Sequence, residues 1–174
     1  MPAVRFVDQL NAQIGNELAA HNQYLACAMH YDALTMPQMA AFFYAQALEE
    51  RGHAMMMVQY LLDTDAEVLI PGVAAPQSTF DDVVAPVRLA LDQERRVSEQ
   101  INDLVRIARE ESDFASEQFM QWFIKEQVEE VATINDLLAV ATRCRGDLED
   151  IEEYVAREQS AGADDPTAPR EAGA

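Results

Sequence analysis

Positive charge is scarce in this sequence, which has 12 lysines and arginines against 31 aspartates and glutamates and a formal net charge of −19. Proteins that bind nucleic acids usually present a basic face, so this balance argues against a nucleic-acid partner. The surplus of carboxylates creates a field that attracts cations. Net charge alone also has a simpler explanation, because an acidic surface keeps a protein soluble.

Cysteine and long apolar runs are scarce too. The two cysteines, Cys27 and Cys144, stand alone on predicted helices, so we expect reduced thiols and no disulfide framework. No apolar stretch near the amino terminus is long enough to span a bilayer or follows a charged segment as in a secretory signal. We therefore expect a cytoplasmic protein without a membrane partner.

Helical patterning dominates what the sequence does contain. The 174 residues, 49% of them hydrophobic, fit one globular domain with a sizeable core. Apolar residues recur every three or four positions over four long stretches, and capping and breaking residues suggest where each helix begins and ends. The predicted helices run from about Val4 to Asp32, Pro37 to Asp63, Asp81 or Asp82 to Glu111, Ser112 or Asp113 to Arg145, and Asp147 to Glu158.

The connections between these helices predict their arrangement. Two turns are short, so the first and second helices, and the third and fourth, should form antiparallel hairpins. The segment Thr64–Phe80 contains Pro71 and Pro76 and can extend to about 50 Å, enough to travel the length of a bundle. We therefore expect an all-α four-helix bundle with one long crossover and a short fifth helix, over residues 1–158. Residues 159–174 bring little to bury and are expected to be disordered.

Each long helix has an apolar stripe that polar residues interrupt near its middle. Burying unpaired carboxylates is costly unless a cation lies between them. At about 3.6 residues per turn, the interruptions lie roughly four turns into their helices, so in a bundle they should meet at one level. The residues that would meet are Glu17, Glu50, His53, Glu94, Gln127 and Glu130.

The spacing of these residues favours a metal site. Glu50 and His53 are three residues apart, so they share a helical face within reach of one ion, and Gln127 and Glu130 repeat that spacing. A di-iron bundle ordinarily uses two Glu-x-x-His pairs and a Glu from each remaining helix. Oxygen-rich ligands with one imidazole suit iron. One such residue alone would more often be an ordinary buried polar group, but four coincident interruptions favour the metal.

The segments that carry these residues resemble those of bacterial non-haem ferritins, and the resemblance covers essentially the whole chain apart from its tail. These segments are Asn16–Leu18, Glu49–Ala54, Asp92–Arg95, Gln118–Phe123 and Glu126–Glu130. The resemblance implies a ferritin-like fold with a di-iron centre inside each subunit.

The same resemblance implies roles for the individual residues. Glu17, Glu50 and His53 would bind a first iron ion, and Glu50 would bridge to a second. The residues around the second ion would be Glu50, Glu94, Gln127 and Glu130.

Three further glutamates lie one residue away from the predicted ligands. The resemblance implies a third iron position near Glu49, Glu126 and Glu129. An exposed acidic helix face explains these three residues almost as well, because charge runs commonly face solvent.

Two aromatic residues and a histidine accompany the predicted centre. Tyr24 lies two turns after Glu17 and could hydrogen-bond a ligand or supply an electron, while Trp122 precedes Gln127 by just over one turn. Both match family positions near the di-iron site, although buried aromatics are usually core. His21, one turn from Glu17, could orient a metal ligand without binding the metal itself.

Two positions separate this chain from related di-iron proteins. Bacterioferritins place a haem-ligating Met immediately after the carboxylate of the second helix, where this chain has Arg51, so we expect no haem. They also repeat Glu-x-x-His on the fourth helix, where this chain has Gln127 and Glu130. A set with one His should hold the second iron ion more loosely, which suits a site that passes its product on.

The function implied by the resemblance is iron storage with ferroxidase activity, in which Fe²⁺ is oxidised by O₂ or H₂O₂ and the ferric mineral is held in a cage of about 24 identical subunits. Asp113 and Glu117, at the start of the fourth helix, would line pores through which iron passes.

Two alternatives stay open at this point. One is a di-iron oxidase or peroxidase that acts on another substrate without storing iron, and the other is a helical scaffold whose polar layer is fortuitous.

Overall fold

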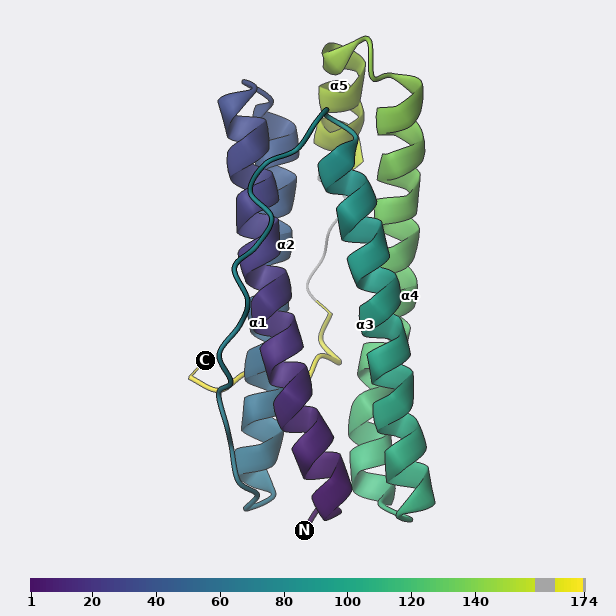
Figure 1. Cartoon of the computed structure of the whole chain (residues 1–174). Coiled ribbons are helices and arrows are strands. Elements are labelled where there is room, and N and C mark those ends of the chain that lie inside the picture. The colour runs from purple at the N-terminus through teal and green to yellow at the C-terminus, as the bar shows by residue number, and fades with distance from the viewer. Residues whose placement is uncertain (159–164, 174) are drawn as a thin grey trace.

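Five helices and no strand make up the computed structural model, which describes residues 1–158 and 165–173. The helices are α1 (Val4–Ala33), α2 (Pro37–Asp63), α3 (Ala85–Glu110), α4 (Phe114–Arg143) and α5 (Leu148–Glu158). Figure 1 shows α1 to α4 side by side as a bundle, with α5 at one end, where it contacts α2 and α4. The predicted all-α bundle with a short fifth helix is confirmed. Among the described residues, no helix has the length and hydropathy needed to cross a bilayer.

Local signals in the sequence explain where the helices begin. Pro37 occupies the first turn of α2, where its missing N–H costs nothing, and the Asp113 side chain accepts a hydrogen bond from the first turn of α4. α3 begins at Ala85, a few residues later than predicted. Asp82 still starts this helix, because its Oδ1 accepts hydrogen bonds from Val84 N at 2.9 Å and Ala85 N at 2.8 Å.

The crossover between α2 and α3 travels the length of the bundle along α1 (Figure 1). Two α1 amides bind its backbone. Asn11 donates to Glu67 O at 2.9 Å and accepts from Leu69 N at 2.7 Å, and Gln23 makes the equivalent pair of bonds with Gln77, both at 2.9 Å. Since later crossover residues bind later α1 residues, the crossover runs parallel to α1. α3 therefore starts at the same end as α2 and runs parallel to it, as predicted.

A polar layer divides the apolar core in two. One cluster of buried residues includes Tyr31, Phe43 and Leu137, and the other includes Phe6, Leu61 and Met120 at the opposite end of the bundle. The same helices contribute to both clusters, so the polar residues between them are held by packing on either side. This division positions the site.

The C-terminal segment, which we define as residues 165–173, lies against the bundle. The Ala172 amide donates to Met55 O at 3.1 Å, and Ala168 and Ala172 pack on the second apolar cluster. The structure differs here from the disorder expected of the tail. The expectation of disorder came from the small number of apolar residues in the tail, whereas these residues are held largely by hydrogen bonds and ion pairs. The remaining tail residues, 159–164 and 174, lie outside the described residues.

Candidate metal centre

Six polar side chains from four helices converge between the two apolar clusters. Each is at most 6% exposed, although five of the six are ionisable. α1 and α3 contribute one residue each, and α2 and α4 contribute two each. We call this set the six-residue centre, and its members are Glu17, Glu50, His53, Glu94, Gln127 and Glu130.

Within this centre the possible ligands fall into two overlapping sets. Glu17, Glu50 and His53 each offer an atom within 4.8 Å of the other two, and so do Glu50, Glu94 and Glu130. Glu50 belongs to both sets. Two cations could therefore share its carboxylate, as two ions in a di-metal bundle do.

Several buried oxygens in the centre have no hydrogen-bond partner. Within the described part of the chain these are Glu17 Oε2, Glu50 Oε2 and Glu130 Oε1. His53 Nδ1 lies 3.7 Å from Glu50 Oε2 and 3.9 Å from Glu130 Oε1, which is too far for hydrogen bonds. A buried acceptor without a partner is costly, so this spacing fits groups that converge on a cation better than groups that bind one another.

Burial and mutual repulsion set the protonation of the centre. Burial, followed by repulsion from Glu130 and Glu17, raises the pKa of Glu50 well above its usual range. Burial, followed by repulsion from Glu94, does the same to the pKa of Glu130. Without a cation, these two carboxyls therefore keep their protons to higher pH than an ordinary glutamate, and a bound divalent ion would displace them.

Hydrogen bonds from neighbouring residues orient the carboxylates. Gln13 Nε2 donates to Glu17 Oε1 at 2.8 Å from one turn earlier on α1. The hydroxyl of Tyr24 donates to Glu94 Oε1, and this bond lowers the pKa of Glu94 against the larger, opposite effect of burial. Burial and the Glu94 charge raise the pKa of Tyr24 well above its usual value, so its hydroxyl keeps its proton.

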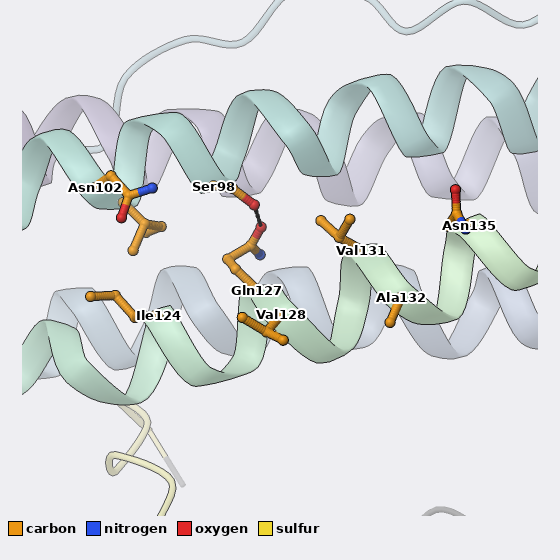
Figure 2. Close-up of a pocket in the computed structure, with 9 residues that line it drawn as sticks. Ser98, Asn102, Ile124, Gln127, Val128, Val131, Ala132 and Asn135 are labelled. Carbon is orange, nitrogen blue, oxygen red and sulfur yellow. Dashed lines mark hydrogen bonds between the residues drawn. The ribbon is translucent and has the colours of Figure 1, made fainter.

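Gln127 faces the carboxylates with its amide nitrogen. Ser98 on α3 donates its hydroxyl to Gln127 Oε1 at 2.9 Å, as Figure 2 shows. Gln127 Nε2 then donates to Glu130 Oε2 and to Glu94 Oε2, the latter at 3.4 Å. In this orientation Gln127 steadies two predicted ligands and does not offer its own oxygen. Ser98 and Gln127 also line a mostly apolar groove of about 490 Å³ between α3 and α4 (Figure 2).

A second group of possible ligands leads outward from the centre. Glu49, His53, Glu126 and Glu130 all offer atoms within 4.8 Å of one another. Glu129, predicted to share a third position with Glu49 and Glu126, is not in that group. It does line a cavity together with Glu49, His53 and Glu126. Its carboxylate lies 3.7 Å from Lys125 Nζ.

The other predicted residues lie in different surroundings. The Trp122 ring meets the His53 ring edge to face, with centroids 5.6 Å apart. The Nδ1 of His21 is 2.6 Å from Ala47 O on α2, so His21 ties α1 to α2 one turn from Glu17.

Asp113 and Glu117 lie where α3 turns into α4, at the end of the bundle. Asp113 is engaged in capping, since it accepts bonds from Ser116 N at 3.2 Å and from Ala3 N at 2.9 Å. The Glu117 carboxylate accepts from Arg109 Nε at 2.7 Å. The chain by itself therefore gives both predicted pore residues structural partners.

Four residues that bind the centre or line the cavity beside it are not among those predicted from sequence, namely Gln13, Ser98, Asp165 and Glu171. Gln13 and Ser98 each lie one helical turn from a predicted ligand, on the same face, and that spacing is the signal that could have identified them. Asp165 and Glu171 belong to the C-terminal segment, and no periodicity connects them to the helices.

Comparison with known proteins agrees with this geometry. The profile of a family described as a ferritin-like domain matches residues 7–144. The chain is 53% identical over 169 residues to ferritin BfrB of Mycolicibacterium smegmatis, covering 97% of this chain and 93% of that protein. It is 33% identical over 147 residues to a bacterial non-heme ferritin of Staphylococcus aureus, covering 84% of this chain and 89% of that protein. The solved structure of an open pore ferritin from the hyperthermophilic archaeon Archaeoglobus fulgidus is similar, with a TM-score of 0.87, 28% identity, and coverage of 94% of this chain and 100% of that one.

Proposed function

This chain belongs to the ferritin family, which stores iron and has ferroxidase function, and we propose that its six-residue centre is where Fe²⁺ is oxidised. The observation that carries this assignment is the set of buried carboxylate oxygens without partners that converge from four helices. A protein gains nothing in stability from such a set unless cations occupy it.

The two ligand sets supply two positions for the substrate Fe²⁺. Glu17, Glu50 and His53 hold one ion, and Glu50, Glu94 and Glu130 hold the other. The sharing of Glu50 keeps the two ions close, so that one oxidant molecule can take an electron from each. Protons displaced from Glu50 and Glu130 when the ions bind leave the carboxylates fully charged for the ferric product.

The oxidant is O₂ or H₂O₂. Two Fe²⁺ ions lose two electrons in all, which with two protons reduce O₂ to H₂O₂ or reduce H₂O₂ to two water molecules. Tyr24 holds Glu94 in place through its hydroxyl and keeps its own proton throughout. Gln127 steadies Glu94 and Glu130 from the opposite side, through a nitrogen that does not bind the ion.

The third iron position is reached through Glu49 and Glu126, which share His53 and Glu130 with the centre. The second ion, held by Glu50, Glu94 and Glu130, can pass outward to this position after oxidation, because Glu130 belongs to both groups. Glu129 adds negative charge at the edge of this route.

We further propose that the chain assembles in the cytoplasm as a cage of about 24 identical subunits, a closed symmetric solution that confines the mineral. Large apolar side chains that are more than 60% exposed on the single chain support an assembly that covers them, among them Met29, Leu48, Phe114 and Val128. Asp113 and Glu117 are the proposed pore carboxylates, with Arg109 competing for Glu117.

Anaerobic titration with Fe²⁺ followed by addition of oxidant tests the assignment. The wild type should bind two Fe²⁺ per chain and then oxidise both within one rapid phase. The ratio of iron oxidised to O₂ or H₂O₂ consumed identifies the oxidant.

Glu50→Ala should abolish the rapid phase while leaving the assembly intact, since it removes the ligand common to both positions. Glu99→Ala, at an exposed site on α3, is the matched control and should behave as wild type. Rapid oxidation by Glu50→Ala would contradict the assignment.

A further inference from the structure

The C-terminal segment closes one side of a cavity that opens between α2 and α4. This side cavity has a volume of about 400 Å³. Its charged and histidine lining comes from Glu49 and His53 on α2, from Lys125, Glu126 and Glu129 on α4, and from Asp165 and Glu171 of the C-terminal segment. The segment thus adds two carboxylates beside the route proposed for the third iron position.

The segment is fixed at both ends. Near its start, Asp165 Oδ2 accepts from Trp122 Nε1 at 3.2 Å and from Lys125 Nζ at 3.0 Å. Near its end, the Arg170 guanidinium lies 3.1 Å from Asp63 Oδ1, and the amide of Ala172 bonds to the α2 backbone. These contacts hold Glu171 in one place although it lies far from α2 in sequence.

Glu171 lies directly on the α2 backbone at Gly52. Its Oε1 is 3.1 Å from the position that a Cβ on residue 52 would occupy, so any side chain there would crowd the carboxylate. Gly52 lies between Glu49 and His53, which both face the cavity. A glycine at this position therefore lets the tail carboxylate approach the ligand-bearing turn of α2.

The two tail carboxylates differ in charge balance. Asp165 is neutralised by Lys125 and serves as an anchor. Glu171 has no hydrogen bond or cationic partner among the residues that the structure describes. Behind the cavity lies Glu130, which offers an atom within 4.8 Å of atoms of Glu49, His53 and Glu126. It is 5% exposed, and its Oε1 lacks a partner in the same part of the chain. A cation would satisfy both groups. It would give a partner to the buried oxygen of Glu130 on the inner side, and it would balance the charge of Glu171 on the outer side.

We propose that Glu171 is an additional iron-binding carboxylate, which receives cations at the mouth of the side cavity and exchanges them with the Glu49 and Glu126 position. This role rests on the proposed ferroxidase function. Glu171 is outside the group of four whose atoms lie within 4.8 Å, so it forms a neighbouring station and not a fifth ligand of that group. Asp165 is a positioning residue that acts by holding the segment.

Terbium luminescence tests the site separately from oxidation. Tb³⁺ prefers oxygen ligands, and Trp122, the only tryptophan in the chain, borders the cavity and can sensitise an ion bound there. Glu171→Gln in the full assembled chain should weaken Tb³⁺ binding by about fivefold or more, the loss expected when one charge near 4 Å disappears. Glu99→Gln removes the same charge from an exposed site on α3 and should leave the titration midpoint unchanged.

Iron kinetics provide the second measurement. Glu171→Gln should slow Fe²⁺ oxidation increasingly as more iron is added per chain, reaching about fivefold when several turnovers are needed. Wild-type affinity for Tb³⁺ and wild-type rates at every iron load would overturn the proposal. If the wild type itself fails to oxidise Fe²⁺, the proposed function fails, and the Tb³⁺ titration still decides whether Glu171 binds cations.

Hydrogen–deuterium exchange of the C-terminal peptide separates loss of charge from loss of docking. Asp165→Asn should release the segment, with fast exchange and the same loss of Tb³⁺ affinity, whereas Glu171→Gln should keep slow exchange. If Glu171→Gln also exchanges fast, Glu171→Asp decides, because it retains the charge. Recovery of Tb³⁺ affinity in Glu171→Asp supports the proposal, and failure to recover overturns it.

Discussion

Replacement of Glu50 by glutamine should stabilise the metal-free protein and remove its stabilisation by metal. Glu50 is 1% exposed, its Oε2 has no hydrogen-bond partner in the described part of the chain, and it belongs to both ligand sets. Burial and the neighbouring carboxylates raise its pKa well above the usual range. A neutral amide of the same shape avoids both the desolvation of a charge and the repulsion.

The size of the effect follows from the geometry. Two charged carboxylates at 4.8 Å, the upper limit of separation within each ligand set, repel by about 3.5 kcal/mol at an effective dielectric constant of about 20. The repulsion cannot cost more than protonating the carboxyl, because a protonated carboxyl carries no charge. Protonation at pH 7 costs about 3.7 kcal/mol for a carboxyl with an ordinary pKa. Glutamine replaces some hydrogen bonds of the carboxyl imperfectly, which reduces the gain. We therefore expect Glu50→Gln to raise the free energy of unfolding of the metal-free protein by about 2 kcal/mol, which corresponds to an increase of about 4–8 °C in Tm.

The difference in stability between the metal-free wild type and Glu50→Gln should depend on pH. A carboxyl whose pKa is raised in the folded state contributes stability below its unfolded pKa, and this contribution is lost as pH rises towards the folded value. The metal-free wild type should therefore lose stability relative to Glu50→Gln as pH rises from about 4.5, the usual value for glutamate, through the raised pKa of Glu50.

Thermal scans at one fixed rate measure these differences, with Glu99→Gln as the control. Zn²⁺ at saturating concentration should raise the Tm of the wild type well above that of the variant. A metal-free variant that melts at or below the wild-type temperature at pH 8 would refute the reasoning.

Three further substitutions test other parts of the structure by thermal scans or exchange. Gly15→Ala would bring a Cβ to 2.4 Å from a proline ring of the crossover, so it should cost about 1–3 kcal/mol, whereas Gly146→Ala, with no atom within 4 Å, should be nearly neutral. Asp113→Ala removes the α4 cap and should cost about 1 kcal/mol, or a Tm lower by about 2–4 °C. Bonds from Thr167 and Lys125 lower the pKa of Asp165, so the slower tail exchange of wild type relative to Asp165→Asn should weaken below about pH 4, the usual value for aspartate, and disappear only as pH falls through the lowered pKa.

The bundle and its centre could be predicted because both depend on helical periodicity. The apolar stripes indicated which faces pack, and the long connection before α3 indicated one crossover. A carboxylate at the middle of a stripe, such as Glu17 or Glu94, is visible in sequence because the helix rises evenly and its partners lie at equal depth. Iron binding by these residues stays a prediction until it is measured.

Other features depend on contacts that periodicity does not encode. The orientation of Gln127 depends on the Ser98 hydroxyl of another helix. Glu129 lies 3.7 Å from Lys125 and is not in the group formed by Glu49, His53, Glu126 and Glu130. The docking of the C-terminal segment rests on polar contacts such as that between Asp165 and Trp122. Composition weighs apolar burial and does not register such contacts, so it predicted disorder.

Aerobic loading with Fe²⁺ in large excess over the two or three ions that one chain could hold, followed by size separation, tests the central claim most directly. Iron that stays soluble and co-elutes with a particle far larger than one chain is the result expected of a storage ferritin. Oxidation that stops near site stoichiometry, or ferric precipitate outside a small oligomer, would contradict storage and favour a di-iron enzyme acting on another substrate.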